Sequence, residues 1–232
     1  VYMPAGEFLM GSENGEADEK PQHTVSLDAY WIDQIEVTNA MYAQCVANGV
    51  CRPPASSGSN TQDQYFGNPE YDQHPVIYVT WDDANTYCNW AGRRLPTEAE
   101  WEKAARGSDA RICPWGNDAP NTSLLNFNWA IGDTTAVSSY PAGVSPYGVF
   151  DMSGNVWEWV ADWYDSNYYN ISPVENPQGP SSGGRRVLRG GSWYYEVNFI
   201  RAAFRFSADA NSMLNDLGFR CAQSVIGPGQ DG

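Results

Sequence analysis

Residues 108–185 limit the folds open to this chain more than any other stretch, because no helix of useful length can be assigned to them. The stretch is rich in Trp, Tyr, Asn and Asp, so it is too aromatic to be disordered. Aromatic residues make up 14% of the whole chain, and Gly and Pro are frequent. We therefore expect a loop-rich globular fold packed by aromatic rings, whose central loops are held by something other than helices.

The length of the chain favours a single domain. Its 232 residues can bury a substantial core, and no interior linker divides them, so one domain is expected over 1–232. The one low-complexity stretch, 172–185, is predicted to be a flexible surface loop. The apolar runs are strand-sized, short of the roughly 20 residues of a membrane-spanning helix. The opening residues, VYMPAGEFLMGS, are typical of a strand and a turn rather than a signal peptide.

The net charge of the chain limits the classes of partner that it can bind. A formal net charge of -15 arises from 28 acidic and 13 basic residues. Such a surface repels nucleic-acid phosphates and anionic membranes, so nucleic-acid binding is not expected. It favours an extracellular or cell-surface protein, or one that recruits calcium through carboxylate and carbonyl oxygens.

Three helices and several short strands can be placed. The helices are expected at 38–49, 80–92 and 97–107, each opened by a threonine cap and closed by a glycine. The glutamates within 98–102 are interpreted as a capping box plus a solvated first turn favoured by the helix dipole, not as paired catalytic carboxylates. Alternating polarity and β-forming residues predict strands within 23–33, 75–81, 135–143 and 185–191.

Five cysteines set a further constraint. Cys45 and Cys51 bracket a short turn that can close locally, whereas Cys88 and Cys221 are distant in sequence. The odd fifth thiol suggests that Cys113 is free or pairs outside this chain. The alternative is five reduced, buried cysteines in a cytosolic protein.

Seven motifs occur in a fixed order along the chain: MPAGEFLMGS, IEVTNAMY, VTWDDANTYCNWAGRRLPTEAEWEKAARG, PWGND, YGVFDMSGNVWEWVADWY, RVLRGGSW and LGFRCA. Together they resemble the formylglycine-generating enzyme (sulfatase-modifying factor) family over nearly the whole chain. The resemblance implies an α+β, C-type-lectin-like fold with low regular secondary structure, few helices and short antiparallel strands.

The resemblance also implies calcium ions that clamp two loop regions. Oxygen-rich sets suit calcium, which takes six to eight oxygen ligands and can order a segment without helices. The alternative for the first set is that Asp151 and Asn155 only form Asx turns. The first set comprises the side chains of Asp151 and Glu158 and the carbonyls of Gly154 and Val156; the second comprises the side chains of Asn126 and Asp133 and the carbonyls of Phe127 and Thr135.

A disulfide is implied as well. The resemblance pairs Cys88 with Cys221, which would tie the end of the chain to a central helix and stabilise it by several kcal/mol. The pairing of Cys45 with Cys51 rests on spacing alone.

The catalytic centres of the family are not expected here. Its oxidases bind copper(I) with two cysteines shortly after the GGS turn, whereas the segment after Ser192, WYYEVNFIRAAFR, contains no cysteine. Soft copper(I) requires soft ligands, so oxygen or aromatic groups cannot replace the thiolates. A related branch holds iron with three histidines, but this chain has only His23 and His74.

A binding scaffold remains as the leading hypothesis. We expect a non-catalytic, calcium-stabilised module outside a bacterium or phage, which binds a protein or glycan through a face formed after the GGSW motif. Tyr and Trp supply rigid contact area, while Asn, Ser and acids supply adaptable hydrogen bonds. Phe199, Ile200 and Phe204 are expected to pack inward. The predicted contact residues are Trp193, Tyr194, Tyr195, Glu196, Asn198, Phe206, Asp209 and Asn211.

Three other interpretations stay open. The fold is also used by the variable proteins of diversity-generating retroelements, in which residues after GGSW vary on a fixed framework. The chain could instead be an oxidoreductase of the family with an unrecognised centre. It could also be a structural subunit of a larger cell-envelope assembly.

Overall fold

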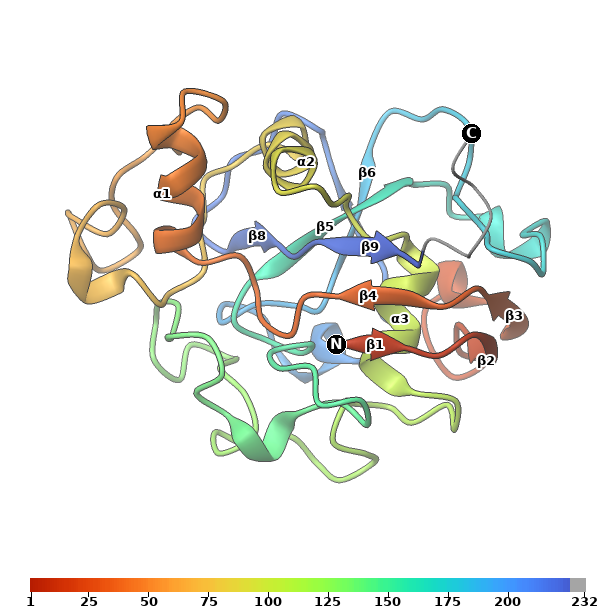
Figure 1. Cartoon of the computed structure of the whole chain (residues 1–232). Coiled ribbons are helices and arrows are strands. Elements are labelled where there is room, and N and C mark those ends of the chain that lie inside the picture. The colour runs from red at the N-terminus through yellow and green to blue at the C-terminus, as the bar shows by residue number, and fades with distance from the viewer. Residues whose placement is uncertain (226–232) are drawn as a thin grey trace.

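The computed structural model describes residues 1–225, which form three α-helices, nine short strands and five 3-10 turns. The three sheets have the strand orders β1-β4-β9, β2-β3 and β7-β6-β5-β8. Figure 1 shows β1, β4 and β9 side by side, with α3 close to them. This is the α+β, C-type-lectin-like architecture that the family resemblance implies. The helices are α1 (Asn39–Ala47), α2 (Trp81–Trp90) and α3 (Glu98–Arg106). The strands are β1 (Tyr2–Met3), β2 (Gly6–Met10), β3 (His23–Leu27), β4 (Tyr30–Ile32), β5 (Trp157–Trp163), β6 (Arg186–Arg189), β7 (Phe206–Ala208), β8 (Leu217–Phe219) and β9 (Ala222–Ser224).

All three predicted helices are present, and their N-caps follow from the sequence. The side-chain hydroxyls of Thr38, Thr80 and Thr97 each accept a hydrogen bond from a backbone amide of the first turn. In α2 and α3 this bond is part of a capping box. Gly107, which ends α3, has a φ of 70° that favours glycine.

The strand predictions are partly wrong. Strands occur within 23–33 (β3 and β4) and 185–191 (β6), but 75–81 and 135–143 contain none. Tyr78, with a φ of 59°, interrupts the extended course of the first segment, and Ser138, with a φ of 61°, interrupts the second. The buried apolar side chains of 75–81 therefore pack into the core from a loop. Period-two patterning cannot distinguish such a loop from a strand.

The buried core falls into two main aromatic and aliphatic clusters. One lies around α3, β1 to β4 and β6, and includes the indole of Trp101. The other joins α1 and α2 to β5 and β8, with Tyr42 and Tyr87 stacked at 5.6 Å between ring centroids. Strand β5, which the sequence analysis did not predict, supplies Trp157 and Trp159 to the second cluster. Its near-complete burial explains why no alternation of polar and apolar residues marks it.

The glutamates of α3 are buried rather than solvated, which corrects the interpretation of the 98–102 series. Glu100 completes the capping box as predicted. Glu102, however, accepts a bond from Arg189 Nη2 at 2.5 Å, and Glu98 is paired with Arg205 Nε at 2.7 Å. Burial acts to raise the pKa of Glu98, but the two arginines bring it below its ordinary value. These ion pairs join α3 to Arg189 at the end of β6 and to Arg205, which follows the GGS turn.

Two disulfides are formed, and both match the predicted pairs. Cys88 of α2 is bonded to Cys221, and Cys45 of α1 is bonded to Cys51. Cys113 is free within residues 1–225 and is buried. Burial raises the pKa of its thiol to about 12.

The long stretch without helices is held by loop contacts. In Figure 1 most of residues 108–150 follow one side of the molecule as irregular chain. The predicted surface loop, 172–185, is mostly exposed, but Ser26 bonds to the backbone of Val174 and Asn176 and attaches the loop to β3. Its flexibility stays a prediction. No helix of residues 1–225 has the length and apolar content needed to cross a bilayer.

Candidate ligand-binding face

The segment after β6 is fixed by a glycine turn and one buried hydroxyl. Gly191 has a φ of 74°, and a Cβ there would lie 2.8 Å from Ile200 Cγ2, so only glycine fits. The Ser192 hydroxyl donates to Asp216 Oδ2 at 2.7 Å. The chain then turns, and the Tyr195 amide donates to the Ser192 carbonyl. This geometry directs successive aromatic side chains to the surface and to the core.

Five aromatic side chains follow one another in contact, and we call them the aromatic row. The rings of Trp129 and Tyr194 lie 4.8 Å apart between centroids, and those of Tyr194 and Tyr195 lie 5.2 Å apart. Phe199 continues the row at 4.9 Å from Tyr195, and Phe204 ends it at 5.1 Å from Phe199. Exposure falls along the row, from 50% for Trp129 to 7% for Phe204.

Trp129 is the residue of this face that sequence reasoning missed. Its backbone amide donates to the Trp193 carbonyl at 2.8 Å, and the amide of Asn128 donates to the Tyr195 carbonyl at 2.9 Å. Both Asn128 and Trp129 have positive φ angles, 51° and 59°. Such strain in two non-glycine residues persists only where the surroundings impose it, and it is typical of functional sites. The only signal in the sequence was a Trp within an Asn-rich loop.

The structure divides the predicted contact residues into four groups. Tyr194, Glu196 and Asn198 are exposed, as a contact surface requires. Trp193 is 1% exposed and lies beneath this surface, packed edge-on against Trp129, so it supports the face rather than touching a ligand.

The remaining members are half-buried or lie elsewhere. Tyr195 and Phe206 are half-buried, and both rings pack on Trp157, at 5.3 Å each. Asp209 and Asn211 are exposed, but they occupy a separate turn that bonds to the start of α2 through the Ala210 carbonyl. Ile200 and Phe204 are buried as predicted, whereas Phe199 is only half-buried.

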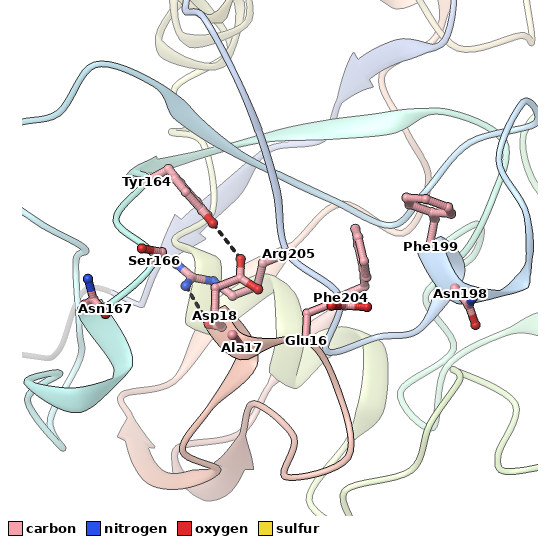
Figure 2. A pocket seen from close by; sticks show the side chains of 10 residues that line it. All are labelled: Glu16, Ala17, Asp18, Tyr164, Ser166, Asn167, Asn198, Phe199, Phe204 and Arg205. Carbon is pink, nitrogen blue, oxygen red and sulfur yellow. Dashed lines mark hydrogen bonds between the residues drawn. The ribbon is translucent and has the colours of Figure 1, made fainter.

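A cavity of about 540 Å³ opens at the buried end of the aromatic row. Figure 2 shows the rings of Phe199 and Phe204 on one side, with Asp18, Tyr164 and Arg205 facing them. The Tyr164 hydroxyl donates to Asp18 Oδ2 at 2.7 Å. The cavity therefore combines aromatic walls with polar groups that come from three distant parts of the sequence.

The first predicted calcium set is only partly available to an ion. Glu158 accepts bonds from Arg220 at 2.6 and 2.7 Å and from Trp101 Nε1 at 2.9 Å, so both its oxygens are engaged. Asp151 is buried and has a φ of 56°, and its Oδ2 accepts a bond from the Ser138 amide. Burial raises the pKa of Asp151 to about 6.

The second predicted calcium set is also only partly available to an ion. Asp133 accepts bonds from Ser59 and Thr61 at Oδ2 and from the Thr134 amide at Oδ1. Asn126 Oδ1 is buried and accepts no hydrogen bond within residues 1–225, although its Nδ2 donates to the Asp133 carbonyl. An unpaired buried oxygen is costly, and a cation would satisfy it.

Asn155 connects the two sets, and sequence reasoning gave it no such role. Its backbone amide donates to the Asn126 carbonyl, and its Oδ1 accepts from the Thr135 amide. Its Nδ2 donates to Glu36 Oε2 at 2.7 Å. Glu36 is fully buried, and its Oε1 accepts no bond in the described part of the chain. Burial and the nearby Asp151 raise the pKa of Glu36 well above its ordinary value.

The remaining candidate metal ligands do not converge. Within residues 1–225, no three side chains of His, Cys, Asp or Glu are placed to hold a metal ion together. The Nδ1 atom of His74 lies 3.2 Å from Thr134 Oγ1, whereas His23 packs against Tyr169. A cation in either predicted set would therefore depend on amide and backbone oxygens for most of its ligands.

Comparison with known proteins places these features in context. The model of the sulfatase-modifying factor enzyme 1-like domain matches residues 1–225. The serine/threonine-protein kinase pkn1 of Chlamydia caviae is 39% identical over 97% of this chain, which spans 38% of the kinase's length. The formylglycine-generating enzyme of Streptomyces coelicolor is 38% identical, covering 97% of this chain and 89% of the enzyme. The inactive C-alpha-formylglycine-generating enzyme 2 of the mouse is 31% identical over the whole chain and 87% of that protein.

Two solved structures share the fold over nearly the whole chain. PvdO from Pseudomonas aeruginosa superposes with a TM-score of 0.81 at 27% identity, covering 97% of this chain and 94% of PvdO. Variable protein 1 of Treponema denticola superposes with a TM-score of 0.76 at 24% identity and the same coverage. The similarity to variable protein 1 shows a shared fold and nothing more.

Proposed function

Because this chain belongs to the family of sulfatase-modifying factor enzyme 1-like domains, we propose that it is a non-catalytic member that binds a protein or glycan ligand through the aromatic row. The observation that carries the proposal is the exposed pair of Trp129 and Tyr194, of which Tyr194 belongs to the segment after Ser192 that lacks the copper-binding thiols. Buried Trp193 supports both rings from below. Large, rigid aromatic side chains held in this way provide contact area at low entropic cost.

The chemistry of the segment supports a binding role over an oxidase role. No cysteine occurs between Ser192 and Cys221, and the latter is bonded to Cys88. Cys113 is buried, with its pKa raised to about 12, so it is a poor thiolate ligand at neutral pH. The mixture of active and inactive relatives is compatible with this proposal. An oxidoreductase with an unrecognised centre is the second candidate, and a subunit of an envelope assembly is the third.

Calcium is part of the proposal. The uncommitted buried oxygens of Asn126 and Glu36, with the carboxylate of Asp151, support a hard cation near the two loop regions. One ion would be held by Asp151 with the carbonyls of 154 and 156, and a second by Asn126 with the carbonyls of 127 and 135. Glu158 and Asp133, which already accept several bonds, would need to share their oxygens. When bound, calcium would add cross-links between the central loops to the hydrogen bonds already present.

The two disulfides support a compartment outside the cytoplasm. Two disulfides persist most readily in an oxidising environment, so we place the protein outside the cytoplasm, at a cell surface or beyond it. We also propose that positions such as Tyr194, Glu196 and Asn198 vary among copies of the gene. Finding a reverse transcriptase beside a near-identical template repeat would support this retroelement hypothesis.

The test of the binding function is an array of purified glycans and extracellular proteins. We expect at least one probe to bind, and the Trp129→Ala/Tyr194→Ala variant to lose that binding by tenfold or more without a change in thermal midpoint. Tyr2 and Trp31 form a second exposed pair, 48% exposed each and 5.2 Å apart between centroids. Tyr2→Ala/Trp31→Ala is therefore the matched control and should bind normally. Equal loss in both variants would contradict a specific face.

A further inference from the structure

The cavity at the buried end of the aromatic row carries excess negative charge. Glu16 and Asp18 line it, and neither forms an ion pair with any residue of the described chain, 1–225. Asp18 is half-buried and Glu16 is exposed. The whole chain adds a field of the same sign, since its formal net charge is -15.

The one cation that lines the cavity does not offset this charge. Arg205 is bound bidentately by Glu98, at 2.7 Å from Nε and 2.9 Å from Nη2. Its Nη1 donates to the carbonyl oxygens of Asp18 and Asp165. The guanidinium is thus paired with a buried carboxylate, and each of its nitrogens is occupied. Arg201, the preceding cation of the segment, is likewise paired with Glu19 at 2.6 Å.

The aromatic walls of the cavity place a second requirement on its ligand, in addition to positive charge. Phe199 and Phe204 meet edge to face at 5.1 Å between centroids, and Tyr164 faces them from the side of Asp18 (Figure 2). Aromatic faces attract cations, and carboxylates supply the acceptors that such cations need. A planar guanidinium satisfies both, because it can stack on a ring and donate a fork of hydrogen bonds. An ammonium group fits the charge but cannot stack.

We propose that this cavity binds an arginine side chain of the protein ligand that contacts the aromatic row. The inference rests on the proposed binding function, and it names the ligand as a protein with a basic side chain. Continuity favours a polypeptide over a small free cation, since the row leads from the exposed pair of Trp129 and Tyr194 to Phe199 and Phe204 at the cavity. The arginine would enter beside Phe199, while neighbouring residues lie over the exposed rings.

The experiment titrates the intact protein with acetyl-arginine-amide and with acetyl-citrulline-amide, a neutral analogue of the same shape, and follows backbone amide shifts by NMR. We expect the arginine probe to shift the amides of Asp18 and Asn198, with at least tenfold weaker binding of the citrulline probe. Equal binding of both probes would overturn the proposal, as would arginine-induced shifts confined to other parts of the molecule.

Isosteric variants localise the effect. Glu16→Gln/Asp18→Asn should remove the preference for arginine, and it should fold normally because the side-chain amide introduced in place of Asp18 still has an oxygen that can accept the Tyr164 bond. Phe199→Leu should weaken the binding of the arginine probe at least threefold, because it removes an aromatic ring on which the guanidinium can stack. Glu7→Gln/Glu70→Gln removes the same charge at two exposed positions and is the matched control. If this control loses arginine binding to the same extent, the binding depends only on the net charge of the protein, and the proposed arginine site is wrong.

The two proposals fail separately. If the array finds a ligand that depends on Trp129 and Tyr194 while the arginine probe does not bind, the cavity proposal is wrong and the binding function stands. If the arginine probe binds the cavity but no ligand depends on the exposed pair, the aromatic row is not a ligand-binding face and the cavity is a separate site.

Discussion

The side-chain amide of Asn155 donates a 2.7 Å hydrogen bond to the buried carboxylate of Glu36, which lies 119 residues earlier in the chain. This is the one bond that Glu36 receives within residues 1–225, and Asn155 also bonds the loops at Asn126 and Thr135. Asn155 thus holds together an N-terminal segment and both candidate calcium regions, through its side-chain amide and its backbone N–H.

Asn155→Ala should therefore be strongly destabilising. The substitution leaves the buried carboxyl group of Glu36 without its donor and the Thr135 amide without its acceptor, while the backbone bond to Asn126 stays. We therefore expect a loss of about 2 to 4 kcal/mol in the free energy of unfolding. Glu36→Gln, measured in the absence of calcium by the same urea titration, should cost far less, since the introduced side chain keeps an oxygen that can accept the bond from Asn155. Similar losses for the two variants would contradict this account of the bond.

Calcium should raise the thermal midpoint of the protein. An ion that binds only the folded state stabilises it by about 2.7 kcal/mol at a hundredfold excess over its dissociation constant. Magnesium should have less effect, because it requires a tighter octahedral arrangement. Scanning calorimetry with calcium, with magnesium and with EDTA measures the shift, and Asp151→Asn should reduce it. Identical midpoints under all three conditions would mean that no calcium site exists.

Neighbouring tyrosines should differ in their contribution to stability. Tyr195 packs against Trp157, Phe199 and Phe206, so Tyr195→Ala should lower the free energy of unfolding by about 2 to 3 kcal/mol. Tyr194 is 48% exposed, and Tyr194→Ala should stay within about 0.5 kcal/mol of the parent. Chemical denaturation of both variants is the measurement. A large cost at Tyr194 would identify it as a core residue and remove it from the face.

The two disulfides should differ in the stability that they add. Cys88 and Cys221 are 133 residues apart, whereas Cys45 and Cys51 are 6 apart. The chain-entropy model assigns about 5 kcal/mol to the long loop and about 2 kcal/mol to the short one. Paired alanine substitutions, compared by their unfolding midpoints, should follow that order. The reverse order would show that strain or residual structure outweighs loop entropy here.

Stability should fall as the pH rises from about 4 towards 8, and Asp162 should cause part of the fall. Asp162 is 3% exposed, and its burial, followed by the charge of Glu98, raises its pKa from 3.8 to about 8. The folded protein thus retains a proton that the unfolded chain has lost. The stabilisation is complete below pH 3.8 and absent above about 8, with a slope of at most about 1.4 kcal/mol per pH unit.

Asp162→Asn isolates that contribution, because every other titrating group is common to the two proteins. Urea unfolding at several pH values should give a flatter profile for this variant than for the parent. Asp118→Asn, at an exposed position, is the control and should keep the parental slope. Parallel profiles for the parent and Asp162→Asn would show that the carboxyl is ionised throughout the range.

Local sequence rules predicted the helices and the Cys45–Cys51 disulfide, whereas the Cys88–Cys221 disulfide was implied by the family resemblance. Each helix begins at a threonine whose hydroxyl meets amides of the first turn, an interaction that depends on neighbours alone. The same rules failed at 75–81 and 135–143. There a positive φ at Tyr78 and at Ser138 is imposed by distant contacts, which no local pattern records.

The sequence by itself determined that this chain is a capped, disulfide-bonded, loop-rich domain without the copper thiols of the family, because caps, cysteines and missing ligands are properties of residue type and order. Only the tertiary structure decided which aromatic rings face solvent. Trp193 and Tyr194 are adjacent in sequence, yet one is buried and the other is exposed, and Trp129 joins them from 64 positions earlier. Two contacts depend on residues that are distant in sequence: the hydrogen bond from the Trp129 amide to the Trp193 carbonyl, and the buried ion pair of Arg205 with Glu98. They depend on how the loops close over the core, and that closure creates both the aromatic row and the acidic cavity at its end.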